Sequence, residues 1–314
     1  MERLKGISMI VLGAMMWGAT GPIMEWMLGN SEMSIQFMLV NRLLVAGVII
    51  LYVLHKKGVD VKSPVRQKVW LRQVILFGMF GMLGVQYSFL AAIEASDAIW
   101  ATLAQFLSPI YVILFVSIYQ KRRPPVGQII GMFVTLIGLF FLLTNGSLEG
   151  FTLSGTALFW GIAVGLAFSF YTLYPARLMQ EWGVIVVVGW GMVVAGTILF
   201  ILNPIRVVTG YQHLSDWRML AGLLVVIVIG TLAFILFLGS MSYITPVETS
   251  ILSSFEPLTA MVISIIWFKV ALGTLQIGGA LTMLIGVIGI SLIGNKVSPE
   301  EVEPNVEWKD DEVV

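Results

Sequence analysis

The chain has 314 residues, of which 58% are apolar and 11% charged, less than half of the charged share of a soluble domain (about 25%). Its mean hydropathy is +0.94. A soluble fold could not cover that much apolar surface, so the sequence predicts an integral membrane protein. The 18 basic and 18 acidic residues cancel, which argues against nucleic acid as a partner.

The sequence contains few side chains that could bind a metal or a cofactor. The chain has no cysteine, which excludes thiolate ligands and cysteine nucleophiles. The histidines, His55 and His213, both fall in polar connections, so we expect no metal site within the membrane. No G-x-S-x-G or H-E-x-x-H motif occurs, and we expect neither an enzyme nor a bound cofactor.

Runs of mostly apolar residues recur along the whole chain at the length of a spanning helix, which needs about 20 residues. They lie near 8–27, 35–54, 74–93, 98–119, 127–143, 154–174, 183–203, 219–239, 246–267 and 275–293. The first run is too long for a signal peptide and no cleavage site follows it, so we expect a retained helix. The runs do not alternate in polarity as barrel strands do. The predicted fold is an all-α, multi-pass membrane protein with ten transmembrane helices.

Basic residues predict the orientation of these helices. Most Lys and Arg residues fall in connections on one side, whereas the other side carries Arg206, Arg218 and Lys269. Because basic connections stay in the cytoplasm, both termini are predicted to be cytoplasmic, in the cell membrane. Residues 295–314 form an acidic tail whose composition is typical of disorder.

The two halves of the sequence match each other. One constant shift aligns Gln128 with Gln276, Gly131 with Gly279, Gly138 with Gly286, and Pro109 with Pro257, and a slightly larger shift aligns Pro22 with Pro175. We therefore predict two five-helix repeats, residues 1–145 and 146–294. Because five is odd, the second repeat crosses the membrane in the opposite direction. Such inverted-topology repeats are common in transporters, with the site near the midplane between them.

Prolines at matching positions indicate where helices are interrupted. Pro109 and Pro257 lie in the fourth and ninth helices, and each removes a hydrogen bond to the carbonyl four residues earlier. Pro22 and Pro175 occupy the matching places in the first and sixth helices. Interrupted helices in corresponding positions of two repeats point to the binding site. We expect all four prolines to break or gate their helices.

Polar residues gather beside these prolines. Thr102, Gln105 and Ser108 step by three along the fourth helix, and the constant shift places them on Ser250, Ser253 and Glu256. Two matching polar stripes predict a shared cavity for a small-molecule substrate. The expected lining residues are Trp17, Thr102, Gln105, Tyr171, Ser250, Ser253 and Glu256. The alternative is that the hydroxyl and amide groups only bond neighbouring helices to one another.

Two charged residues fall at membrane depth, where a charge is costly unless it faces water or a partner. For Glu256 three interpretations stay open: it binds a substrate cation or a coupling proton, it bonds the backbone opened by Pro257 as a neutral acid, or it pairs with Arg42. Arg42 is also placed to reach the outer surface or to pair with Glu25.

Short motifs in a fixed order resemble one known family. They are "WGATGP" at 17–22, "NRLL" at 41–44, "SP" at Ser108–Pro109, "GQIIG" at 127–131, "EP" at Glu256–Pro257 and "LQIGG" at 275–279, with "IG" at 137–138 and 285–286. This set resembles the EamA branch of the drug/metabolite transporter superfamily. An acidic residue usual in that family just after the fourth and ninth helices is missing from "YQKRRPP" and "WFKVALG". The resemblance implies a ten-helix carrier with a central cavity, usually exporting amino acids or related metabolites.

The expected function is therefore a secondary transporter that exports small metabolites by alternating access. No phosphate-binding P-loop is present, so coupling would come from a proton or from the substrate gradient. Efflux of lipophilic cations is the alternative, which Glu256 and the aromatic residues would suit. A membrane scaffold or receptor without transport is a third hypothesis. Because one chain already holds both halves, we expect a monomer.

Overall fold

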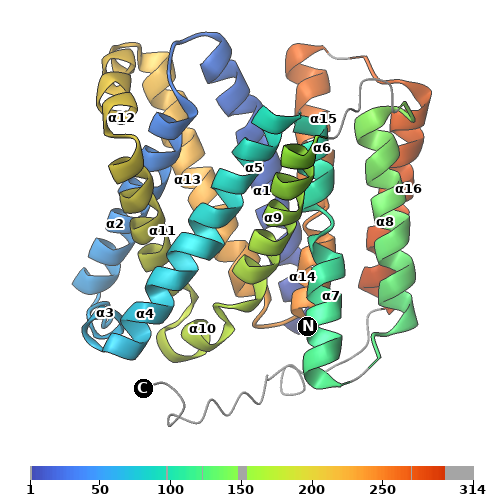
Figure 1. Ribbon diagram of the computed structural model, residues 1–314, viewed down its shortest axis with the longest axis horizontal. Coiled ribbons are helices and arrows are strands. Elements are labelled where there is room, and N and C mark those ends of the chain that lie inside the picture. Colours follow the sequence, from blue (N-terminus) through green and yellow to red (C-terminus); the bar gives the residue numbers. More distant parts are fainter. Residues whose placement is uncertain (1, 97, 122, 148–153, 270, 294–314) are drawn as a thin grey trace.

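The computed structural model describes residues 2–96, 98–121, 123–147, 154–269 and 271–293, and every regular element within these ranges is a helix (Figure 1). The acidic tail predicted at 295–314 lies outside the described residues. The first half contains α1 (Glu2–Gly29), α2 (Ile35–Lys56), α3 (Ser63–Arg66), α4 (Lys68–Leu76), η1 (Phe77–Leu83), α5 (Gly84–Ala95), α6 (Ala98–Gln105), α7 (Ser108–Gln120) and α8 (Val126–Thr144). The second contains α9 (Gly155–Leu173), α10 (Ala176–Trp182), α11 (Val184–Leu202), α12 (Pro204–Gly210), η2 (Tyr211–Ser215), α13 (Trp217–Ser240), α14 (Pro246–Leu252), α15 (Phe255–Phe268) and α16 (Thr274–Ile293).

These elements form the predicted membrane spans. Within the described ranges, nine helical segments are long and apolar enough to cross a membrane, and α16, with 20 residues, supplies the tenth. The segment 68–95 is a single span in which η1 is a seven-residue π-helical turn between α4 and α5. No pattern in the sequence predicts that turn. The connections expected at 55–73 and 204–218 contain the short helices α3, α12 and η2.

The interruptions occur at three of the four predicted prolines. The fourth span breaks between α6 and α7 before Pro109, and the ninth breaks between α14 and α15 before Pro257. Pro175 separates α9 from α10. At Pro22 the prediction of a break is wrong, because α1 continues through that residue without interruption. Helices packed on both sides can tolerate one missing backbone hydrogen bond.

The helices of the two halves pair across the molecule (Figure 1). α1 packs against α13 and α15 of the second half, and α9 packs against α5 and α7 of the first. α2 pairs with α11 and α8 with α16, so each of these spans contacts its own counterpart. Exchanging the halves therefore leaves the pairing unchanged, as expected for a molecule with an internal twofold axis.

The contacts between α8 and α16 show that this axis inverts the second half. A Cβ added to Gly138 would lie 2.7 Å from the carbonyl oxygen of Gly279, and one added to Gly286 would lie 3.0 Å from that of Gly131. The constant shift found in the sequence places Gly138 on Gly286 and Gly131 on Gly279, so it turns the first of these contacts into the second. Gly131 contacts Gly286, whereas Gly138, later in α8, contacts Gly279, earlier in α16. The two helices are therefore antiparallel. A twofold axis between antiparallel equivalents is perpendicular to both, so the predicted inversion is confirmed.

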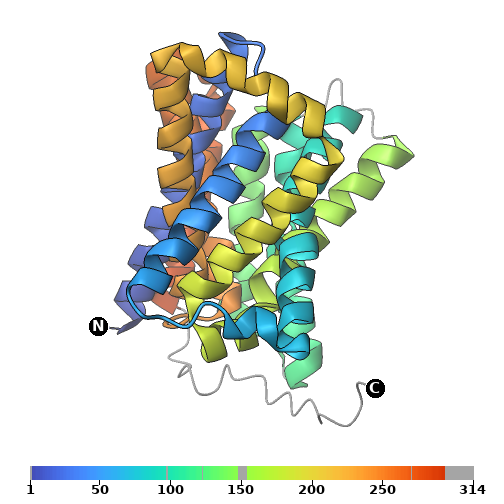
Figure 2. The same ribbon diagram turned by 90° about the vertical axis from the view of Figure 1, so that its left-hand side faces the viewer.

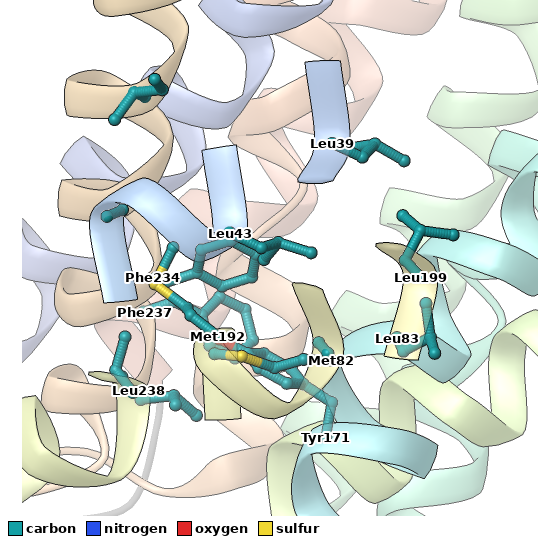
Figure 3. Packing of buried hydrophobic residues seen from close by; sticks show 14 of the residues in the cluster. Leu39, Leu43, Met82, Leu83, Tyr171, Met192, Leu199, Phe234, Phe237 and Leu238 are labelled. Carbon is teal, nitrogen blue, oxygen red and sulfur yellow. The ribbon is translucent and has the colours of Figure 1, made fainter. Parts of the chain in front are cut away.

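The two ends of the bundle differ in composition. α1 begins at the end where α3, α4 and α10 lie, and α12 lies across the opposite end (Figures 1 and 2). We call these the N-terminal end and the α12 end. The connection between α2 and α4, at the N-terminal end, is rich in lysine and arginine. The main buried cluster lies between the two ends, where α2, η1, α9, α11 and α13 meet (Figure 3).

Candidate functional site

The helix breaks bury the serines that were expected to line a cavity. Ser250 and Ser253 are fully buried, and their hydroxyls donate to carbonyls of their own helix, Ser250 to Val247 at 2.9 Å and Ser253 to Ser250 at 2.7 Å. The carbonyl oxygen that Pro257 leaves without its helical partner, that of Ser253, accepts instead from the backbone nitrogen of Glu256 at 2.9 Å. In the first half, Gln105 is likewise buried at the end of α6.

Trp17 and Tyr171 belong to one aromatic cluster near the centre of the bundle. The Trp17 ring lies 5.0 Å from Phe234 and 5.2 Å from Phe237 of α13, measured between ring centroids. Phe168 and Tyr171 of α9 are each 6.3 Å from it. The cluster therefore joins the first helix of each half to α13, and Figure 3 shows Tyr171, Phe234 and Phe237 within the same buried core.

Arg42 enters this cluster from α2. Its guanidinium lies 5.4 Å from the Phe234 ring centroid, within the range of a cation–π contact. Its aliphatic stem passes α13 at Gly230, where an added Cβ would lie 3.1 Å from the Arg42 Cδ. Arg42 Nη2 donates a 3.1 Å hydrogen bond to Oε1 of Gln86, while the buried Nε has no partner. Only 7% of the residue is exposed.

Glu256 faces the same cluster from the break between α14 and α15. Its Oε2 is buried without a hydrogen-bond partner, as is the hydroxyl of Tyr171. Both groups lie close enough to Arg42 to interact electrostatically with it. Within the described residues, however, Arg42 forms an ion pair neither with Glu256 nor with Glu25, the two partners that the sequence offered. Gly18 of α1 holds this region together by packing against the Glu256 backbone.

The arrangement leaves three buried polar atoms available to a ligand. Arg42 Nε can donate, Glu256 Oε2 can accept, and the Tyr171 hydroxyl can do both. Burying an ionised group without full pairing costs several kcal/mol. Ionisable residues kept at membrane depth despite that cost are by default candidates for a functional site.

A cavity of about 180 Å³ lies beside this cluster, between α2, α5 and α11. None of the seven predicted lining residues borders it; Gln86 does. Sequence reasoning missed Gln86, although it is a polar residue in the apolar run 74–93. A single glutamine in a spanning helix is commonly a packing residue, so that signal alone could not identify it.

Two inverted halves, interrupted helices at membrane depth and a buried charged cluster between the halves define a multi-pass membrane transporter. The chain belongs to the EamA-like transporter family, whose sequence profile matches residues 4–144 and 155–292. The family lies within the drug/metabolite transporter superfamily, so the resemblance seen in the sequence is confirmed. It is a family of transporters and not of enzymes, and membership implies a small-molecule substrate.

Two relatives are also described as transporters. The chain is 34% identical over 289 residues to the "Uncharacterized inner membrane transporter YicL" of Salmonella typhimurium, covering 92% of this chain and 95% of that protein. It is 26% identical over 219 residues to an "Uncharacterized transporter" of Archaeoglobus fulgidus, covering 69% of this chain and 75% of that protein. A solved crystal structure matches with a TM-score of 0.72 and 16% identity over 92% of this chain and 96% of that one, which shows a shared fold.

Proposed function

We propose that the protein is a secondary carrier that exports small soluble metabolites, such as amino acids, across the cell membrane by alternating access. The observation that carries this proposal is the exchange-symmetric packing of two inverted halves around Arg42 and Glu256. In such a molecule, a change that opens one end is matched by an equivalent change that opens the other. The two states can therefore be close in free energy.

The broken spans supply the moving parts. Pro109, Pro175 and Pro257 each lie at a break between two helical segments, and the chain between α6 and α7 or between α14 and α15 can bend without disrupting a continuous helix. Pro22, within an unbroken α1, does not act as such a break. We propose that the predicted cavity residues, from Trp17 and Thr102 to Ser253 and Glu256, border the transport path in states other than the one described here.

Glu256 is proposed as the residue that couples transport to protons. Its Oε2 is buried and without a partner, so a proton or a substrate ammonium can bind there without displacing an existing contact. A Glu256→Gln variant keeps the shape and loses the ionisation. We expect it to exchange substrate across the membrane while losing dependence on the pH gradient. Glu25→Gln, at an exposed carboxylate, is the matched control.

Efflux of lipophilic cations is the second candidate, and the aromatic cluster around Trp17 favours it. Aromatic faces attract cations by cation–π interactions. The buried guanidinium of Arg42 lies against the Phe234 face, however, and it would repel a second cation there. This repulsion favours a substrate with an acidic or zwitterionic head group.

Proteoliposomes containing the purified protein would test the proposal. Counterflow of radiolabelled amino acids and related metabolites, with pH and membrane potential varied separately, should show saturable exchange for at least one of them. Transport confined to quaternary ammonium dyes would establish the second candidate instead. No flux of any solute by folded protein would refute the carrier function.

We also propose that both termini are cytoplasmic, because the connection between α2 and α4 at the N-terminal end carries a dense group of basic residues. Single cysteines, introduced one at a time into this chain that has none, can report the side. Lys57→Cys should react with an impermeant reagent only after cells are opened. The proposed monomer, with repeats at 1–145 and 146–294, can be tested from the mass of the purified protein.

A further inference from the structure

The cavity between α2, α5 and α11 is lined mainly by apolar side chains, together with the polar residues Gln36, Gln86, Glu94 and Asn203. Leu39, Leu83 and Leu199, from three different spans, form much of the apolar wall and are grouped on one side of the buried core in Figure 3. Asn203, at the end of α11 that leads into α12, also borders the cavity. A volume of about 180 Å³ equals the share of about six water molecules in liquid water. A small organic solute fits such a space.

Gln86 separates the cavity from Arg42. It borders the cavity, its Oε1 accepts the bond from Arg42 Nη2 at 3.1 Å, and its Nε2 donates to the carbonyl oxygen of Met82 in η1 at 3.2 Å. Rotation of the Gln86 side chain alone would break its bond to Arg42 and expose the guanidinium to the cavity.

The uncovered edge of Arg42 matches a carboxylate. The Nε and Nη2 N–H groups lie along the same edge of the planar guanidinium, where they can bond both oxygens of one carboxylate. Gln86 offers a single oxygen to Nη2, and Nε remains buried without a partner. A carboxylate would satisfy both donors and neutralise a charge that is 93% buried, since only 7% of Arg42 is exposed.

Resting on the proposed function, we propose that this cavity binds a small monocarboxylate with a short apolar chain, and that its carboxylate displaces Gln86 from Arg42. The apolar chain lies against Leu39, Leu83 and Leu199. Gln86 is then the residue that determines specificity, because it closes the guanidinium edge to solutes that cannot offer two oxygens. At the Gln86 side of the cavity Arg42 repels an amine, so Glu94, which also lines the cavity, is the group that an amine would have to use instead. An alcohol offers one acceptor atom, no more than the Gln86 amide already offers to Arg42.

Cysteine protection in purified protein tests this directly. Leu83→Cys, in a chain without other cysteines, places a thiol at the cavity wall beside Gln86. Its reaction with methyl methanethiosulfonate, followed by mass spectrometry, is timed with 3-methylbutanoate, 3-methylbutanol or 3-methylbutylamine, which share one carbon skeleton. We expect only the carboxylate to slow the reaction. Lys57→Cys, exposed at the N-terminal end, should react equally fast with all three.

Substitution of Gln86 tests the role of the amide. Gln86→Glu places a tethered carboxylate on Arg42, so the concentration of 3-methylbutanoate needed for protection should rise at least tenfold, roughly the effect of losing hydrogen bonds to a charged group. Gln212→Glu, an exposed position outside the cavity at the same end, adds the same charge and should leave protection unchanged. If Leu83→Cys does not fold, Asn203→Cys, at another position that borders the cavity, replaces it.

The proposal is overturned if the alcohol or the amine protects as well as the carboxylate, if no probe protects, or if Gln86→Glu binds 3-methylbutanoate normally. The binding readout needs no flux. A protein that shows carboxylate protection but moves no solute in proteoliposomes would refute the carrier function and leave this site standing. Flux of a solute without protection by the carboxylate would support the carrier function and refute this binding site.

Discussion

Adjacent glycines in α16 should respond to the same substitution in opposite directions. Gly279 faces α8, where an added Cβ would lie 2.5 Å from the backbone nitrogen of Leu142 and 2.6 Å from the carbonyl oxygen of Gly138. Gly278 has nothing within 4 Å of an added Cβ. We predict that Gly279→Ala destabilises the protein and that Gly278→Ala stabilises it.

The magnitudes follow from these distances. Both atoms near Gly279 belong to the backbone, so no side chain can move aside and α8 must separate from α16, at a cost of about 1–3 kcal/mol for overpacking. Alanine at Gly278 gains about 0.5–1 kcal/mol, the usual advantage over glycine within a helix. The same gain applies at Gly279 and cancels in the comparison, so the two variants should differ by the overpacking cost of about 1–3 kcal/mol, which corresponds to several degrees in apparent melting temperature.

Thermal unfolding of both variants, purified in the same detergent and followed by tryptophan fluorescence, would measure this difference. Gly278→Ala is the matched control, since it makes the same chemical change one residue away in the same helix. Equal melting temperatures, or a more stable Gly279→Ala, would refute the close contact between α8 and α16 and with it the evidence for inversion drawn from those helices.

Three further predictions concern the ends and the centre of the bundle. The 2.8 Å ion pair between Arg3 and Glu248 joins the start of α1 to α14; because Arg3 is 32% exposed, it is worth about 1 kcal/mol. If this ion pair keeps the N-terminal end closed, Glu248→Gln should speed the labelling of a cysteine introduced at Ser250 about fivefold. An unchanged labelling rate would show that the ion pair does not close that end. Trp100→Phe removes a 2.9 Å hydrogen bond to the Ala157 carbonyl, worth about 1 kcal/mol, and should lower the apparent melting temperature by a few degrees; an unchanged value would speak against that bond. Glu256→Gln should retain the fold and lose pH-dependent transport in proteoliposomes, and full pH dependence would exclude proton coupling at this residue.

Much of the fold could be predicted because its causes are local. Spans follow from runs of apolar residues, and the breaks at Pro109 and Pro257 follow from a missing N–H group. Pro22 shows where that reasoning ends. It aligns with Pro175, yet α1 continues through it, with α13 and α15 packed closely against α1 at Gly13 and Gly18. Whether a proline breaks a helix depends on neighbours that the local sequence does not reveal.

The candidate site was less predictable because its contacts join distant segments. The sequence identified Arg42 and Glu256 as charged residues that are costly at membrane depth. Reasoning from charge alone, however, suggests only other charged residues as their partners. The partner found, Gln86, is neutral and lies in another span. Its position also depends on η1, since it bonds the carbonyl of Met82 within that π-helical turn. Such turns occur often at functional sites, and no composition signal marks this one.

The two ends of the bundle are equivalent in architecture but not in chemistry. Glu248 and Trp100 occupy matching positions, each in the first turn of a broken span, and each contacts the start of the first helix of the other half. At the N-terminal end that contact is an ion pair; at the α12 end it is a hydrogen bond from an indole to a backbone carbonyl. Salt weakens the former and hardly affects the latter. An inverted repeat alone would make the two closed ends equal in free energy, so substitutions at such matching positions can shift the balance between the states that open at one end and at the other.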